Sequence, residues 1–284
     1  MAYLLILISV SANIAQGIFI KQYNSKHNKG GFTFNALISL AAMLFFLVTD
    51  KEGFYIPSGM LSYAVISGTI YCVASFLTYI ALGCGSFALS NLILSYSLVF
   101  TIGYGILFLK EPVSVYTVIG MLILMLSLFL TRGEKKEEKQ DVSAKWLICI
   151  ILSFVGSGMF SVLNRMQQIR FDNSCTNEYM VLSMGFSAVV LLIAGILKEK
   201  KDLPYIMKYG SLYALGAGAM NGATNLLSLI VMMMIPISIS SPTTAGLKVV
   251  LSFAVSKWIY KEVFLRRQVI GVMLGAIALV FLNI

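Results

Sequence analysis

Charged residues are scarce in this sequence of 284 residues, since Asp, Glu, Lys and Arg together make up only 12% of the chain. That share is about half of what soluble domains usually carry. Apolar residues reach 58%, and the mean hydropathy is +0.88. A soluble protein of this length could not shield so much apolar surface from water. The composition therefore excludes a soluble enzyme, a disordered regulator and a secreted disulfide scaffold, and it indicates a membrane protein with several spans.

Residues suited to metal and redox chemistry are few as well. The chain has one histidine and four cysteines, and no two cysteines form a C-x-x-C pair. This pattern predicts neither a metal site nor a disulfide framework, and we expect no cofactor. No basic face with interleaved aromatic residues points to a nucleic-acid partner, and no G-x-x-x-x-G-K-[ST] loop points to ATP hydrolysis. The expected partners are the lipid bilayer and a small-molecule substrate, and the sequence leaves the oligomeric state open.

Long apolar runs account for most of the chain. Each is close to the roughly 20 residues that a helix needs to cross a bilayer, and none alternates as a barrel strand would. The sequence therefore predicts an all-α membrane protein with ten transmembrane helices. The ten runs are Ala2–Phe19, Phe32–Val48, Leu61–Gly83, Phe87–Leu109, Val113–Leu130, Trp146–Leu163, Tyr179–Leu197, Gly210–Ile230, Ile237–Tyr260 and Val263–Ile284.

A charged stretch, Thr131–Lys145, divides these runs into five and five. Because five is an odd number, a second copy of the first half would enter the membrane from the opposite side. We therefore expect two inverted five-helix repeats, over residues 1–130 and 146–284, joined by a charged linker over 131–145. That architecture is typical of secondary transporters, whose substrate site lies near the bilayer midplane. Residues that recur at an offset of 151 support the duplication: Asn13 and Asn164, Gln16 and Gln167, Ser90 and Ser241, and Lys110-Glu111 and Lys261-Glu262.

Two tight helix–Glu–helix hairpins mark the ends of the fourth and ninth runs. They read Phe108-Leu109-Lys110-Glu111-Pro112 and Ile259-Tyr260-Lys261-Glu262, and an Ile-Gly pair follows each one, at Ile119-Gly120 and Ile270-Gly271. In these features the chain resembles the drug/metabolite transporter superfamily, in its EamA-like branch, over nearly its whole length. The resemblance implies a carrier for small metabolites, often an exporter, with a central cavity between the repeats, and it implies that the Glu residues close the turns.

Lys248 departs from the pattern of that family, which commonly has an acidic residue followed by proline at this place. The corresponding position in the first half is Ser97. Lys248 is the only ionisable residue near the centre of an apolar run, and an unpaired ammonium there costs at least ~2.5 kcal/mol. We therefore expect Lys248 to contact an anionic substrate group or to take part in proton coupling. The alternative is a lysine held by backbone carbonyls or facing a water-filled crevice.

Other polar residues inside the apolar runs are candidates for substrate binding. Residues 221–228 place four of them on one face of the eighth run. Hydroxyls around Pro242 suggest a locally broken helix over Ser238–Thr244. The alternative for all of these residues is hydrogen bonding between helices. The candidates besides Lys248 are Asn13, Tyr71, Ser75, Tyr79, Asn91, Ser97, Asn164, Asn221, Thr224, Asn225, Ser228, Ser241 and Thr244.

Basic residues are distributed unevenly among the loops. Sixteen Lys and Arg residues lie in the odd-numbered loops and four in the even-numbered loops. The positive-inside rule therefore predicts that the odd-numbered loops face the cytoplasm and that both termini lie outside. The family resemblance implies the reverse, with both termini inside.

Taken together, these features predict a transporter and not an enzyme. The expected function is secondary active transport of a small metabolite, preferably an anionic or carboxylate-bearing one, by alternating access across the cell membrane. The protein would act as an exporter or exchanger. The alternative is an intramembrane enzyme or flippase acting on a lipid-linked substrate. An enzyme would need a nucleophile with a base, or a metal cluster, at membrane depth, and the sequence offers neither.

Overall fold

The computed structural model describes residues 1–27, 29–50, 53–111, 114–131, 144–261 and 266–281. Within these ranges all regular secondary structure is helical. Most of the expected charged linker, together with Pro112 and Glu262 of the two hairpins, lies outside the described residues. The structure is thus all-α, as the apolar runs predict.

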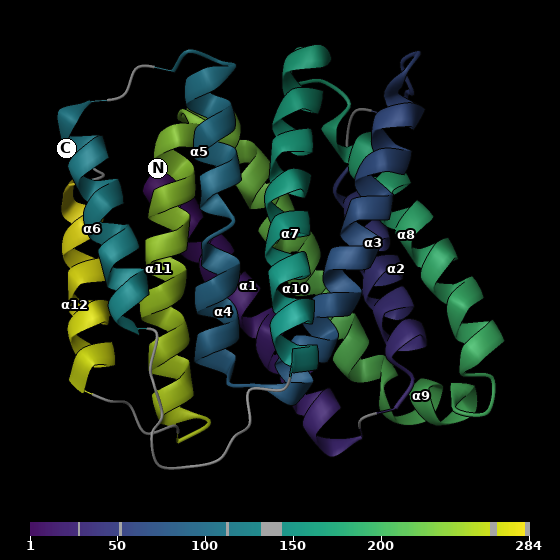
Figure 1. The fold of residues 1–284 in the computed structure, drawn as a ribbon. Coiled ribbons are helices and arrows are strands. Elements are labelled where there is room, and N and C mark those ends of the chain that lie inside the picture. Colours follow the sequence, from purple (N-terminus) through teal and green to yellow (C-terminus); the bar gives the residue numbers. More distant parts are fainter. Residues whose placement is uncertain (28, 51–52, 112–113, 132–143, 262–265, 282–284) are drawn as a thin grey trace.

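Twelve helices follow one another in the described ranges (Figure 1). The predicted fourth run contains two of them, and one short helix lies between the seventh and eighth runs. The helices are α1 (Ala2–Lys26), α2 (Gly31–Thr49), α3 (Met60–Cys84), α4 (Phe87–Ser95), α5 (Leu98–Leu107), α6 (Val115–Thr131), α7 (Ala144–Arg170), α8 (Thr176–Lys198), α9 (Leu203–Tyr209), α10 (Ser211–Met234), α11 (Ile237–Trp258) and α12 (Arg266–Phe281).

Seven segments of the described chain are long and apolar enough to cross a membrane. They are α1, α2, α3, the segment Ser90–Leu107 across α4 and α5, α7, α8 and α10. The helices α6 and α12 are shorter, with 17 and 16 residues. In α11, several hydroxyl residues and Lys248 lower the hydropathy. The number of spans that length and composition support is therefore smaller than the ten predicted.

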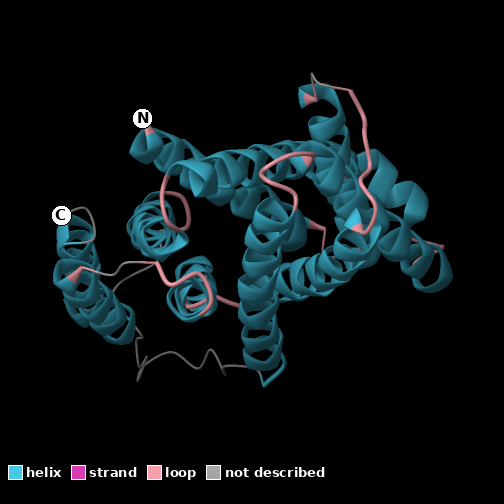
Figure 2. Ribbon diagram, turned by 90° about the horizontal axis from the view of Figure 1, so that it is seen from above, coloured by secondary structure: helices cyan, strands magenta, loops and turns pink. Residues whose placement is uncertain are grey.

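The two halves of the chain pack against each other throughout the bundle. Helix α1 packs against α10 and α3 against α7, while α2 packs against α8 and α6 against α12. The pair formed by α6 and α12 lies at one edge of the bundle (Figures 1 and 2). Helix α1 begins and α12 ends on the same side of the bundle (Figure 1).

Two glycines allow α3 to approach α8 closely and α10 to approach α2 closely. A Cβ atom at Gly68 of α3 would lie 2.6 Å from the carbonyl oxygen of Ser183 in α8. A Cβ atom at Gly218 of α10 would lie at the same distance from the carbonyl oxygen of Ile38 in α2. Small residues are the usual way for membrane helices to pack this tightly. The contact of α3 with α8 thus has a counterpart in the contact of α10 with α2.

Hydroxyl groups form a second matched pair of contacts. Ser9 of α1 donates to the carbonyl oxygen of Thr224 at 3.1 Å and hydrogen-bonds the hydroxyl of Ser228 at 3.1 Å. Ser153 of α7 donates to the carbonyl oxygen of Ala74 at 3.0 Å and hydrogen-bonds the hydroxyl of Thr78. Ser9 and Ser153 therefore have the same surroundings in α1 and α7.

The matched serines also revise the internal alignment of the first helix of each half. Ser9 and Ser153 are 144 residues apart, whereas the recurring residues predicted an offset of 151. The difference of seven residues is close to two helical turns, so it leaves side chains on nearly the same face. Asn13 and Asn164 therefore lie on corresponding faces of α1 and α7. The hydrogen bonds of Ser9 and Ser153, however, do not align these two asparagines as equivalent positions.

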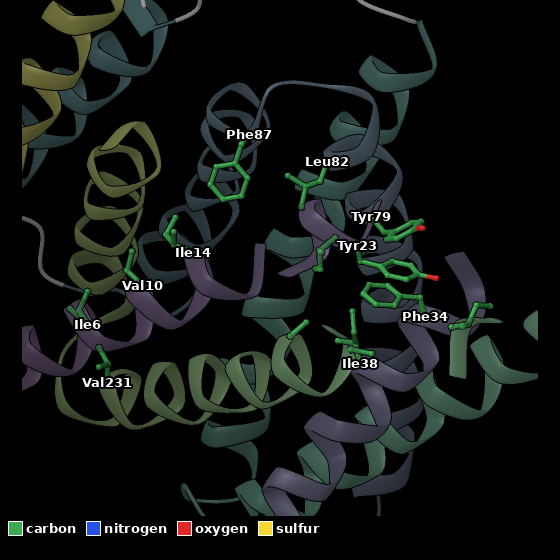
Figure 3. Close-up of a cluster of buried hydrophobic side chains, with 14 residues drawn as sticks. Ile6, Val10, Ile14, Tyr23, Phe34, Ile38, Tyr79, Leu82, Phe87 and Val231 are labelled. Atoms are coloured by element: carbon green, nitrogen blue, oxygen red, sulfur yellow. The ribbon is translucent and has the colours of Figure 1, made fainter. Parts of the chain in front are cut away.

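Three aromatic rings pack together within a buried apolar cluster that also contains Ile206 of the short helix α9. Figure 3 shows the three rings. We call Tyr23, Phe34 and Tyr79 the aromatic cluster. The rings of Tyr23 and Phe34 stack with centroids 4.0 Å apart, and the centroids of Phe34 and Tyr79 are 5.7 Å apart. The Tyr23 hydroxyl donates to the carbonyl oxygen of Lys29 at 2.9 Å. The aromatic cluster thus joins α1, α2 and α3 by side-chain packing.

Candidate functional site

A cavity of about 290 Å³ lies among helices from both halves of the chain. Of its 35 lining residues, 22 carry a hydroxyl, an amide or an ammonium group. These side chains can donate and accept hydrogen bonds, so the cavity is suited to a ligand with polar groups. Thirteen of the predicted binding residues line it, and their contact with a substrate stays a prediction. They are Asn13, Tyr71, Ser75, Asn91, Ser97, Asn164, Asn221, Thr224, Asn225, Ser228, Ser241, Thr244 and Lys248.

Tyr79 is the one candidate that the structure does not bring to the cavity. Its ring belongs to the aromatic cluster, and only 5% of the residue is exposed. Its carbonyl oxygen accepts a hydrogen bond of 2.8 Å from Nδ2 of Asn24. Tyr79 follows Tyr71 by eight residues, which turns its side chain by about 80° around the helix axis. This rotation accounts for the place of Tyr79 outside the cavity lining, and its predicted role in substrate binding stays a prediction.

Several lining residues had not been predicted. Ser157 and Ser161 precede Asn164 on α7 at intervals of four and three residues. Ser9 and Gln16 lie on either side of Asn13 on α1 at the same intervals. Intervals of this kind place side chains on one helix face. A search for polar residues at helical spacing would therefore have found them. The other polar lining residues outside the set of candidates were Asn35, Thr78, Ser95, Thr101 and Ser240.

A chain of amides connects α1 and α10 beside the cavity. The Nδ2 atom of Asn225 donates to Oδ1 of Asn221 at 3.1 Å, and Nδ2 of Asn221 donates to Oε1 of Gln16 at 3.3 Å. The hydroxyl of Tyr71 in α3 also lines the cavity and makes no hydrogen bond to the described residues. These groups supply both donors and acceptors to the cavity wall, because an amide side chain carries both.

The helix break of the structure lies between α4 and α5. The amide groups of Tyr96 and Ser97 donate to residues three positions earlier, Ile93 and Leu94, at 3.0 and 3.1 Å. This tighter pattern interrupts the regular i to i−4 bonding at the middle of the segment. Ser97 lines the cavity at the break. The irregular backbone thus faces the cavity and not lipid, which is where a membrane protein can tolerate it.

Helix α11 is continuous, in contrast to the broken helix predicted around Pro242. Pro242 is the sixth residue of α11, and the helix continues through it to Trp258. The hydroxyl of Thr243 donates to the carbonyl oxygen of Ile239 at 2.9 Å, and that of Thr244 to Ser240 at 2.8 Å. These hydroxyls therefore bond to the helix itself.

Glu111 holds the start of α11. Its carboxylate oxygens accept hydrogen bonds from the backbone N–H groups of Ile237 at 3.2 Å and Ser238 at 2.9 Å. A carboxylate at this position also interacts favourably with the positive end of the helix dipole. The side chain of the first hairpin thus fixes a helix of the second half, which is a role beyond closing its own turn.

Lys248 lies in the middle of α11 and lines the cavity. Across the described residues, no hydrogen bond or ion pair to its ammonium group is found, and no Asp or Glu lines the cavity. The described carboxylates of Glu111 and Glu199 instead accept hydrogen bonds from backbone N–H groups at helix ends. The cavity therefore has one positive group and no protein anion near it.

A helical bundle of this apolar composition, with a polar cavity at mid-span, defines a multi-pass transmembrane protein. Residues 1–133 match the model of the EamA-like transporter family, which confirms the resemblance inferred from the hairpins. The members of that family are membrane transporters of small molecules. The first 133 residues are therefore similar to this family, and together with the long apolar helices this match indicates a multi-pass membrane protein concerned with transport.

Comparison with solved structures supports the fold over the whole chain. A structure described only as a crystal structure of a protein aligns with a TM-score of 0.71 at 13% sequence identity. The alignment covers 100% of this chain and 98% of that one. At this level of identity the likeness concerns the fold alone. No curated protein matches the sequence.

Proposed function

We propose that the protein is a secondary active transporter that moves a small anionic or carboxylate-bearing metabolite across the cell membrane. It would act by alternating access, as an exporter or exchanger. The observation that carries the proposal is the Lys248 ammonium, which faces a polar cavity at mid-span without a protein anion. An isolated charge at this depth is costly. An anionic substrate group that enters the cavity would offset that cost while it is bound.

The packing of the two halves supports an arrangement of ten spans in two inverted repeats. The contact of α1 with α10 has its counterpart in that of α7 with α3. Two further pairs of contacts match between the halves in the same way. One pair is the hydrogen bonds of Ser9 and Ser153, and the other is the close helix approaches at Gly68 and Gly218. In such proteins one repeat rocks against the other around a site at their interface. The cavity lies between the halves, where that movement would expose it to each side in turn.

Transport can be measured with the purified full-length protein in liposomes. Vesicles loaded with an unlabelled carboxylate would receive radiolabelled gluconate, malate or pyruvate outside, and uptake driven by exchange would be followed. Lys248→Met removes the ammonium and keeps a long apolar side chain. Lys257→Met makes the same change at an exposed residue of α11 that does not line the cavity.

We expect wild type to exchange at least one of the three carboxylates. Lys248→Met should lower that rate at least tenfold, whereas Lys257→Met should keep it. Two results would contradict the proposal. One is exchange of no carboxylate by a correctly folded wild-type protein, and the other is an unchanged rate in Lys248→Met.

A further inference from the structure

We infer that the substrate is a monocarboxylate with several hydroxyl groups, of the sugar-acid type. This inference rests on the proposed function and narrows its substrate class. It follows from three properties of the cavity, which are its charge, its hydrogen-bonding groups and its small number of rings.

The charge of the cavity wall limits the charge of the ligand. Among the 35 lining residues, all of which belong to the described chain, Lys248 is the one Lys, Arg, Asp, Glu or His. An amino acid would bring an ammonium group that finds no carboxylate there. A dicarboxylate would bring a second negative group that finds no second cation. Because an unpaired charge is costly at membrane depth, a single negative charge fits best.

The hydrogen-bonding groups of the wall suit hydroxyls on the ligand. Seven lining residues carry amides, and each amide side chain can both donate and accept. A hydroxyl also does both, so a row of hydroxyls on a ligand can pair with such a surface. An aliphatic carboxylate would instead leave the remaining donor and acceptor positions of these groups without partners, which costs free energy in a closed site. The seven amides belong to Asn13, Gln16, Asn35, Asn91, Asn164, Asn221 and Asn225.

Two of the buried polar lining groups have no partner within the described protein. The Ser240 hydroxyl is buried and without a hydrogen bond, and only 3% of this residue is exposed. The Tyr71 hydroxyl is also buried and makes no hydrogen bond to the described residues. Buried polar groups are rarely left unpaired. Both groups therefore point to a hydrogen-bonding ligand.

Few aromatic rings line the cavity. Tyr71 and Phe160 are the only two among its lining residues. Their rings pack against each other, with centroids 5.3 Å apart. This arrangement leaves little flat surface on which an aromatic acid could stack. The cavity thus favours a hydroxylated ligand over an aromatic one.

The test is ligand-induced thermal stabilisation of the purified full-length protein, because a ligand that binds the folded state raises its melting temperature. Four probes separate the features of the ligand. Gluconate has one carboxylate and five hydroxyls, hexanoate has the carboxylate alone, sorbitol has the hydroxyls alone, and glutamine is a zwitterion of similar size. Three variants accompany wild type: Lys248→Met, Ser240→Ala and Ser256→Ala. Ser256 matches Ser240, because its hydroxyl is also buried and unpaired on α11 but does not line the cavity.

We expect gluconate to stabilise wild type with an apparent affinity at least tenfold above that of the other three probes. Lys248→Met should abolish the effect of gluconate. Ser240→Ala should weaken gluconate binding severalfold, whereas Ser256→Ala should leave it unchanged.

The alternative outcomes separate this inference from the proposed function. Equal binding of hexanoate and gluconate, both sensitive to Lys248→Met, would overturn the hydroxylated substrate and leave the anion transporter intact. Tighter binding of glutamine than of gluconate would overturn the inference that the substrate carries a single negative charge. Binding of sorbitol as tight as that of gluconate, unaffected by Lys248→Met, would overturn both this inference and the proposed role of Lys248. Failure of every probe, together with no exchange of carboxylates in liposomes, would likewise overturn both.

Discussion

The segment α4–α5 and the helix α11 occupy corresponding places in the two halves, yet they differ at the cavity. Ser97 lies at a break between two short helices, whereas Lys248 lies 151 residues later on an unbroken helix. Both residues line the same cavity. The comparison teaches that the two halves differ in backbone and in charge at corresponding places. One half supplies an irregular backbone, and the other supplies the one ammonium group among the described residues that line the cavity.

The largest expected effect comes from proline at the two positions that follow these residues. Val249→Pro would place proline inside the continuous α11, where it removes a hydrogen bond and clashes with the preceding turn. Leu98→Pro would place it at the first residue of α5, where no intrahelical bond is lost, although its ring disfavours the αR conformation of Ser97. We expect Val249→Pro to destabilise the protein by roughly 3 kcal/mol or more, and the proline ring of Leu98→Pro to cost less. Thermal unfolding of both variants measures the difference.

Alanine variants at the same positions provide the control. Leu98 and Val249 are both buried, with 5% and 0% exposed, so any substitution also removes packing. Subtracting the effects of Leu98→Ala and Val249→Ala isolates the contribution of the proline ring. Equal ring contributions at both positions would show that the break between α4 and α5 does not distinguish the two halves.

Most of the fold could be predicted from the apolar runs, because lipid requires long stretches without charge. The run Phe32–Val48 corresponds to α2, Gly31–Thr49, within one residue at each end. The short α9 was missed, since seven residues at a membrane boundary carry no apolar run. The break at Tyr96 and Ser97 was also missed, because no proline or glycine marks it there and it depends on how the segment packs against α7 and α11.

The lining of the cavity could be predicted for a different reason. A polar side chain in a membrane helix is driven away from lipid, so its sequence alone indicates that it faces inward. This holds for Asn221 and Lys248, which both line the cavity. Tyr79 also faces inward, but its ring packs in the buried aromatic cluster and not at the cavity wall. Which inward-facing residues touch a substrate cannot be derived from burial alone.

A smaller effect is expected where the first hairpin holds α11. Glu111→Gln keeps the shape of the side chain and removes its charge from the start of the helix. Capping interactions of this kind contribute about 1 kcal/mol. We expect the melting temperature to fall by ~2 °C, which follows from the usual entropy of unfolding at this chain length. The shift should shrink at high salt, since the charge is screened.

Asp172→Asn is the matched control for Glu111→Gln. Asp172 is an exposed residue of the loop between α7 and α8, and it holds no helix terminus. Its substitution removes the same unit of charge and should leave the melting temperature unchanged. Equal shifts in the two variants would indicate a general charge effect and would remove the special role of Glu111 at α11.

The smallest effect is expected at the lysines of the two hairpins, where the halves are alike. Lys110 and Lys261 both have positive backbone angles, with φ of 51° and 53°. A residue with a side chain pays roughly 1 kcal/mol for this left-handed conformation, which glycine adopts without strain. Lys110→Gly and Lys261→Gly should therefore each raise the melting temperature slightly and by similar amounts. A rise of the melting temperature in one variant and a fall in the other would mean that the two hairpins differ in structure. The resemblance between the halves would then be restricted to their helices.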